Sequence, residues 1–215
     1  MMRKLAVAAG LLCAVGTVAQ AHEIYGAIGT DGIGVGYAYS VTSFANVRGE
    51  FDGFSLTHSF TSGDVNYDAK LNLYHGGLFI DLFPAASVVP FHFTAGMLIG
   101  GDNIDANANP MSGTYSINGV TVNANGETIH AKAKFPTVRP YVGFGFGHGT
   151  QSKGLSASFD AGVAFGRPHV DYDVPADIVT AAGQENVNAE EADLQNKVDR
   201  LRFYPIIKIG VTYRF

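Results

Sequence analysis

Apolar and polar side chains alternate along the last segment of the chain, from Leu201 to Phe215. Because successive side chains of a strand point to opposite faces, this period of two gives the segment one continuous apolar face. We expect lipid to cover that face. A strand in lipid must belong to a closed barrel, since an open edge would leave backbone N–H and C=O groups unpaired. The apolar members are Leu201, Phe203, Pro205, Ile207, Ile209, Val211, Tyr213 and Phe215.

The same period of two returns in seven earlier segments. Asp31-Gly32 is a hairpin-turn signal between the first two of them. The apolar phase shifts near Gly53 and again at Gly76-Gly77, which predicts a bulge in the third strand and leaves the facing of the third and fourth strands open. Eight strands, an even number, predict an all-β, eight-stranded antiparallel transmembrane barrel with both ends in the periplasm. The seven segments cover residues 24–29, 33–41, 47–56, 67–83, 91–100, 138–147 and 155–165.

The connections between these strands differ in length. Three are short, whereas residues 102–134 and 167–200 form long segments, which the topology places outside the cell as two extracellular loops. The first long loop contains an Asn118-Gly119 hairpin signal. The second has apolar residues at helical spacing, which predicts a short helix over 189–200, capped by Asn188 with Glu191 and lying over the barrel mouth.

The start of the chain has the features of a secretory signal. A basic beginning is followed by an apolar core over residues 5–18 and by the small-x-small sequence Ala19-Gln20-Ala21. This pattern predicts a signal peptide over 1–21, cleaved after Ala21, and a barrel domain over 22–215. A lipoprotein signal acylated at Cys13 is the disfavoured alternative, because the leucine before it stands where a small residue is expected.

Composition excludes several functions. The chain has 215 residues, enough for one domain, and its single cysteine lies within the predicted signal. The formal net charge is −5, which makes nucleic acid an unsuitable partner. We expect no cofactor and no metal, since a copper site at the new amino terminus, His22, would need a second imidazole and the other histidines show no clustered spacing.

Charged side chains recur on the face of the strands opposite to the apolar one. The interior of an eight-stranded barrel is only wide enough for side chains, so buried charges there must pair with one another. We therefore expect an interior plugged by ion pairs. Inward glycines at positions 34, 36, 143, 145 and 147 keep a narrow passage as the alternative. The expected interior charges are Arg48, Glu50, Asp52, Asp81, Arg139, Asp160, Arg202, Lys208 and Arg214.

The sequence does not favour an enzyme. His58 and Ser59 are adjacent, so they point to opposite sides of a strand and cannot act as base and nucleophile. His169 and Asp171 share a face, but no serine accompanies them. We expect no catalytic residue.

The signal, the eight alternating segments and the terminal run Phe203 to Phe215 resemble the small OmpA-like and OmpW-like outer-membrane β-barrel proteins of Gram-negative bacteria. The resemblance implies a monomer in the cell outer membrane, in contact with lipid and lipopolysaccharide, with periplasmic chaperones and the barrel assembly machinery as partners during biogenesis. By resemblance, Ile209, Val211, Tyr213 and Phe215 form the assembly signal. The resemblance also implies a structural or surface-interaction role. A narrow OmpW-like channel for small apolar molecules and a lipid A-modifying enzyme are the alternatives.

Overall fold

Eight long strands dominate the computed structural model, which describes residues 22–62, 65–149 and 153–215. The predicted signal peptide, with Ala19 and Ala21, lies outside the described residues. The prediction of a mainly β chain is confirmed. The eight strands are β1 (His22–Gly29), β2 (Gly32–Thr42), β3 (Ala45–Ser62), β4 (Val65–Leu82), β5 (Phe91–Gly100), β10 (Val138–Phe146), β11 (Gly154–Phe165) and β13 (Phe203–Arg214).

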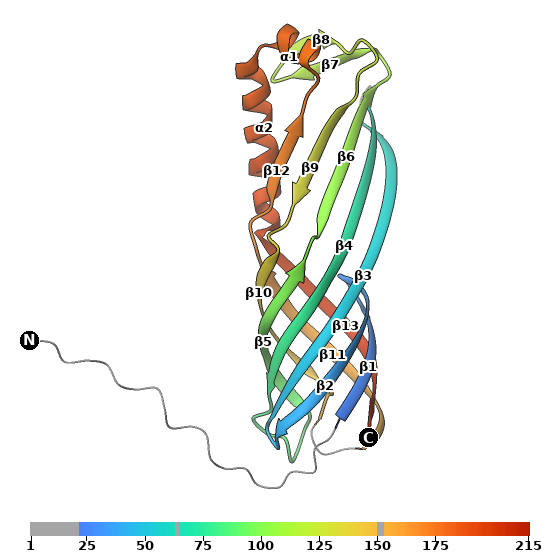
Figure 1. The fold of residues 1–215 in the computed structure, drawn as a ribbon, viewed down its shortest axis with the longest axis vertical. Helices are drawn as coiled ribbons and strands as arrows, with labels where there is room; N and C mark the ends of the chain where they lie inside the picture. Colours follow the sequence, from blue (N-terminus) through green and yellow to red (C-terminus); the bar gives the residue numbers. More distant parts are fainter. Residues whose placement is uncertain (1–21, 63–64, 150–152) are drawn as a thin grey trace, which may run out of the picture.

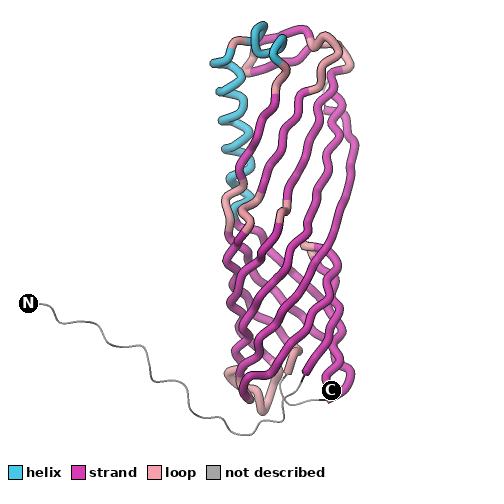
Figure 2. The backbone as a smooth tube through the Cα atoms, viewed as in Figure 1, coloured by secondary structure: helices cyan, strands magenta, loops and turns pink. Residues whose placement is uncertain are grey.

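These eight strands pair into a closed ring. Each is antiparallel to its neighbours in the order β1, β2, β3, β4, β5, β10, β11 and β13, and β13 pairs back with β1. The crossing strands of the ring form the lower part of the molecule in Figures 1 and 2, with the carboxyl terminus at its bottom edge. A closed ring satisfies the backbone groups of every member strand, so none is left with a free edge.

Alternation separates the two faces of the ring. Large apolar side chains point outward and remain exposed, while polar and charged side chains at the intervening positions are buried inside. This is the inverse of a water-soluble sheet packed on an apolar core, and it is typical of a barrel in lipid. Outward members from the eight strands include Ile24, Val35, Phe51, Leu78, Phe93, Val142, Phe159 and Ile209.

Strands β3 and β4 continue beyond the ring and carry a second body, which we call the extension. Their outer parts, residues 54–62 and 65–72, form a sheet with β6 (Asn103–Pro110), β9 (Ile129–Lys134) and β12 (His169–Asp173), in the order β3-β4-β6-β9-β12. Helix α2 (Gln184–Val198) packs along β12 (Figure 1).

Strands β6, β9 and β12 were not predicted from the sequence. Their sequences do alternate, as in Asn-Ile-Asp-Ala-Asn-Ala-Asn-Pro for β6, but the apolar members of β6 are mostly small, and every residue of this strand is partly exposed. Parts of the two segments expected to be loops therefore form strands, which pair with the outer part of β4 and extend the sheet.

A small apolar core closes the far end of the extension. Hairpin β7 (Thr114–Ile117) and β8 (Val120–Asn123) packs with α1 (Ala176–Ala182) and α2. Asn118 and Gly119 have φ values of 47° and 81°, so the predicted Asn-Gly hairpin is confirmed. The buried members of this core are Tyr115, Ile117, Val122, Ala124, Ile129, Ile178, Ala182 and Val187.

The hairpin predicted between β1 and β2 is present, but its turn is shifted by one residue, and the predicted bulge in the third strand is wrong. The turn between β1 and β2 consists of Thr30 and Asp31, while Gly32 begins β2 with a φ of 124°. The β3–β4 register runs through Gly53 without a bulge, and the irregularity lies between Ser40 and Thr42. The phase shift near Gly53 has another cause, since the last β2–β3 pair is Ile33 with Gly53 and β3 leaves the ring there.

The predicted helix exists but differs in its start, cap and place. It begins at Gln184 rather than 189, its N-cap is Gly183 without a side-chain bond, and Asn188 and Glu191 lie inside it. It lies along β12 and not over the mouth (Figure 1). Val187 is the one large apolar residue of the first turn, so the apolar spacing there is weak. None of the helices in the described part of the chain is long and apolar enough to cross a membrane.

Candidate functional site in the interior of the ring

The structure buries most of the predicted interior charges. Arg202 is the exception, because it is exposed in a 3-10 helix, η1 (Asp199–Arg202), with its guanidinium carbon 4.9 Å from the ring centroid of Phe203. Strand β13 begins only at Phe203, so extending the period of two to Arg202 was wrong. The buried members are Arg48, Glu50, Asp52, Asp81, Arg139, Asp160, Lys208 and Arg214.

Further buried groups were not predicted from the sequence. Asp31, Asp102 and His148 lie in turns and connections, where a strand period carries no information about facing. Glu23 and His75 lie on strands, and the alternation of β1 and β4 could have placed both inside.

One group of buried charges surrounds Lys208. The Lys208 Nζ lies 2.8 Å from Asp31 Oδ2, 2.5 Å from Glu50 Oε1 and 2.8 Å from Asp52 Oδ1. His75 Nδ1 lies 3.0 Å from Asp102 Oδ2, and Arg139 pairs with the same carboxylate. We call this group the Lys208 cluster; its members are Asp31, Glu50, Asp52, His75, Asp102, Arg139 and Lys208.

A second group surrounds Arg48. The Arg48 guanidinium pairs with Asp81 at 2.6 Å and with Asp160 at 3.1 Å. Glu23 accepts from Arg214 at 2.9 Å and lies 2.5 Å from His148 Nδ1. Asp160 also contacts His92 and His148. We call this group the Arg48 cluster; its members are Glu23, Arg48, Asp81, His92, His148, Asp160 and Arg214.

An apolar layer lies between the two clusters on β4 and β5, whereas on β3 the inward side chains of Arg48 and Glu50 bring the clusters next to each other. On β4, Phe79 lies between His75 and Asp81, and on β5, Leu98 lies between Asp102 and His92. The gap where the layer meets the clusters has a volume of about 10 Å³, about the space one water molecule needs. The layer consists of Phe79, Leu98, Tyr141, Ala164 and Ile206.

Large side chains lie beside three of the inward glycines. A Cβ at Gly36 would meet the ring of Tyr25, and a Cβ at Gly145 would meet His92. At Gly143 it would meet the hydroxyl of Tyr141. These glycines make room for large side chains inside the ring.

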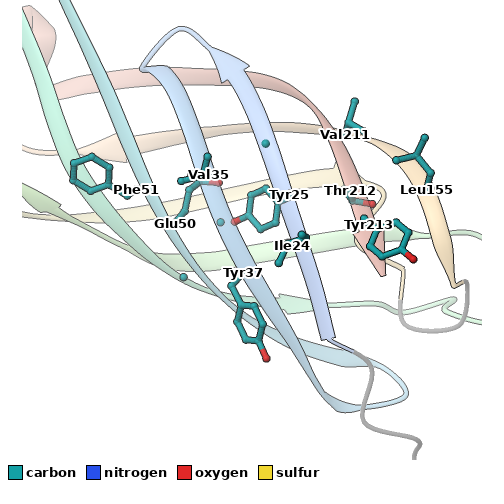
Figure 3. A pocket seen from close by; sticks show the side chains of 13 residues that line it. Ile24, Tyr25, Val35, Tyr37, Glu50, Phe51, Leu155, Val211, Thr212 and Tyr213 are labelled. Atoms are coloured by element: carbon teal, nitrogen blue, oxygen red, sulfur yellow. The ribbon is translucent and has the colours of Figure 1, made fainter. Parts of the chain in front are cut away.

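A shallow apolar groove of about 660 Å³ lies on the wall of the ring (Figure 3). The outward glycines Gly26 and Gly49 lie in its floor, and a Cβ at either would meet no atom closer than 3.9 Å. The exposed side chains around it include Ile24, Val35 and Val211. The groove belongs to the apolar outer surface.

The assembly-signal residues lie at the end of β13. Ile209, Val211 and Tyr213 are exposed on the outside of the ring. Phe215 is also exposed, and its backbone N–H donates to the His22 carbonyl at 3.0 Å. The carboxyl terminus is thereby joined to the start of β1.

The histidines considered from the sequence as catalytic or copper-binding candidates lie outside the two buried clusters. His169 Nε2 is 3.5 Å from Asp171 Oδ1, and both side chains are exposed on the extension. The Lys134 ammonium, 2.5 Å from Asp171, holds the pKa of that carboxyl below its usual value. His58 is exposed and stacks on Phe60. His22 Nδ1 bonds to the Tyr37 hydroxyl.

Comparison with known proteins gives a likeness in fold. No protein-family model and no curated protein matches the chain. Crystal structures of Acinetobacter baumannii CarO and CarO2 match with TM-scores of 0.58 and 0.61, each at 20% identity and over 91% of this chain, and over 97% and 98% of theirs. A major outer membrane protein from Thermus thermophilus matches at a TM-score of 0.43 and 11% identity, over 92% of this chain and 100% of that one.

The closed ring, its apolar outside and the likeness in fold place the chain in the class of outer-membrane β-barrels. The predicted location, the cell outer membrane, is confirmed.

Proposed function

We propose that the protein is an eight-stranded outer-membrane barrel with a plugged interior, whose role is structural or surface interaction through the extension. The observation that carries this proposal is the filling of the ring by two ion-paired clusters and an apolar layer, which together line a gap of about 10 Å³. A solute path would have to break several buried ion pairs, each costly to separate.

The extension supports the surface role. It has its own apolar core, and its polar strands and helix add a large polar surface at the end of the ring opposite to the carboxyl terminus (Figure 2). With both termini in the periplasm, the extension lies outside the cell.

Conductance in planar bilayers tests the plug. Purified wild-type protein should show no reproducible single-channel steps under conditions in which a general porin conducts. Regular steps from the wild-type protein would contradict the plug and favour the narrow OmpW-like channel. The proposed role involves no catalysis. A loss of mass from lipid A when the protein is expressed would contradict this and favour a lipid A-modifying enzyme.

Cysteine labelling tests the orientation. The only cysteine of the chain, Cys13, lies in the predicted signal, so single-cysteine variants give a clean readout. Ser112, in the extension, and Ser87, in the turn between β4 and β5, are both exposed. A membrane-impermeant maleimide should label S112C but not S87C on intact cells, and both after lysis. The reverse pattern would contradict the orientation.

A further inference from the structure

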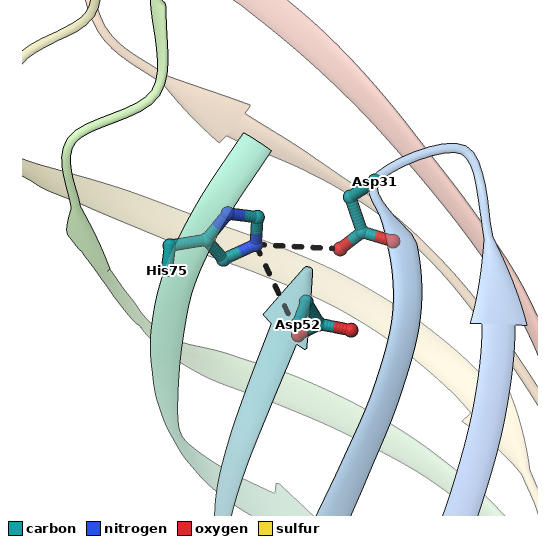
Figure 4. A group of neighbouring side chains, drawn as sticks. All are labelled: Asp31, Asp52 and His75. Carbon is teal, nitrogen blue, oxygen red and sulfur yellow. Dashed lines mark ion pairs between the residues drawn. The ribbon is translucent and has the colours of Figure 1, made fainter. Parts of the chain in front are cut away.

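Three side chains converge where the ring meets the extension (Figure 4). Asp31, Asp52 and His75 come from the β1–β2 turn, β3 and β4, and they are 0%, 0% and 2% exposed. His75 Nε2 and Asp52 Oδ2 have no hydrogen-bond partner among the described residues. Two buried polar atoms with unmet bonding capacity therefore point into one small space, which is costly unless a ligand satisfies them.

The spacing fits a metal ion better than hydrogen bonds. His75 Nε2 lies 3.6 Å from Asp31 Oδ2 and 3.9 Å from Asp52 Oδ2, too far for hydrogen bonds. Ligand atoms about 2.1 Å from a tetrahedral zinc ion lie about 3.4 Å from one another. One candidate ligand atom from each of the three residues lies within 4.8 Å of the other two, so a bound ion would draw them closer together.

The charge of the Lys208 cluster points the same way. Its carboxylates are Asp31, Glu50, Asp52 and Asp102, whereas its fixed cations are only Lys208 and Arg139. The cluster is therefore two positive charges short, and His75 can contribute at most one. A divalent cation supplies both charges in a place where unbalanced charge is expensive.

His75 is already oriented as a metal ligand. Its Nδ1 lies 3.0 Å from Asp102 Oδ2, and Arg139 pairs with the same carboxylate oxygen. A carboxylate on one imidazole nitrogen fixes the ring and leaves the other nitrogen free for a metal, the usual arrangement around metal-binding histidines. Asp102 would then be a positioning residue for the site.

We propose that Asp31, Asp52 and His75 bind a first-row divalent cation such as Zn²⁺. One imidazole nitrogen and two carboxylate oxygens form a donor set that suits such ions. The ion would join the β1–β2 turn to β3 and β4 and balance the charge of the Lys208 cluster. The sequence predicted no metal site, because Asp31 was assigned to a turn and the facing of residues 67–83 was left open.

Metal titration of the full mature barrel tests the proposal. The protein is refolded in detergent, stripped with EDTA, and titrated with Zn²⁺ by calorimetry and with Co²⁺ by visible absorption. We expect one ion per chain, Co²⁺ absorption bands of a low-symmetry site, and a higher urea midpoint with Zn²⁺ bound. H75Q should weaken binding more than tenfold, and D102N by about 10–100-fold.

H169Q is the matched control, since His169 also faces an aspartate but is exposed on the extension. Its affinity should equal that of the wild type. Absence of stoichiometric binding by the wild-type protein, or equal affinity of H75Q and H169Q, would overturn the proposal. Should H75Q not refold, D102N decides, and an unchanged affinity in D102N overturns the proposal as well.

Discussion

At the scale of single residues, the interior is held by side chains that each serve several partners. Lys208 is the only lysine in its cluster and contacts three carboxylates at 2.5–2.8 Å. Each of these carboxylates is buried, so its solvation must come from protein groups. The alternation of β13 predicted that Lys208 faces inward, but Asp31 could not be predicted as its partner, because a turn residue has no strand period.

Lys208→Met should therefore be strongly destabilising. Removing one member of a buried ion pair typically costs about 3–5 kcal/mol, because the partner charges stay buried without compensation. The measurement is the urea unfolding free energy of the refolded protein in detergent. Lys132→Met is the control, since Lys132 pairs with Asp105 at 2.8 Å on the exposed extension and should lose less than about 1 kcal/mol. Equal losses in both variants would contradict a buried charge network.

Gly36 tests whether the inward glycines accommodate rings. A methyl group there would overlap the buried ring of Tyr25, so Gly36→Ala should destabilise the barrel by about 1–3 kcal/mol. Gly49→Ala is matched, because it lies on a neighbouring strand and its Cβ would meet only Leu78 at 3.9 Å. The same urea titration compares them. A neutral Gly36→Ala variant would show that this space is open.

At the scale of elements, a strand was predicted correctly where its two faces differ strongly in polarity. The bounds of β5 were predicted as observed, 91–100, because apolar and small or polar residues alternate throughout it. Strand β6 was missed although polar and apolar residues alternate along it, because its apolar face consists mainly of small residues and is only partly buried. Hairpin β7–β8 was predicted from Asn118-Gly119, because this turn requires positive φ at both positions and Asn and Gly are the residues that adopt positive φ most readily.

Replacing Asn118 and Gly119 by alanine should unfold the β7–β8 hairpin and leave the ring folded. Alanines at positions 118 and 119 must adopt left-handed backbone, at a cost of about 1–2 kcal/mol each, and the Asn118 bond to Asn186 is lost. We expect faster proteolysis within residues 111–128, with unchanged mobility of the unheated barrel on a gel. A variant that no longer forms the barrel would contradict the independence of the extension.

At the scale of the whole molecule, the ring requires lipid around it and the extension requires water. The sequence predicted the ring from eight alternating segments, whereas β6, β9 and β12 of the extension were missed because their alternation is short and weakly apolar and lies in segments interpreted as loops. Val142 on the ring and Leu56 on the extension are equally exposed, at 52%. Exposure alone therefore does not distinguish their surroundings.

An arginine at each position does distinguish them. Val142→Arg should cost about 2–4 kcal/mol in a lipid bilayer, because the charge lies near the middle of the apolar band. Leu56→Arg should change the unfolding free energy by less than about 0.5 kcal/mol, as for ordinary surface sites. Unfolding from lipid vesicles measures both. Similar small effects would show that no hydrocarbon covers Val142.

The carboxyl end tests assembly in the cell. Deleting Phe215 removes the terminal aromatic and the backbone bond to His22, so the amount of folded protein in the outer membrane should fall severalfold. Phe215→Tyr keeps both features and should assemble at the wild-type level. Cell fractionation followed by immunoblotting measures the amounts. Unchanged assembly of the deletion variant would contradict the role given to this end.

The most direct measurement of the central claim is folding of the urea-denatured mature chain with and without detergent, followed by electrophoresis of unheated and boiled samples. We predict a compact form of distinct mobility only after folding into micelles, converted by boiling to the mobility of the unfolded chain. Folded, monodisperse protein in detergent-free buffer would contradict a ring whose outer surface requires lipid.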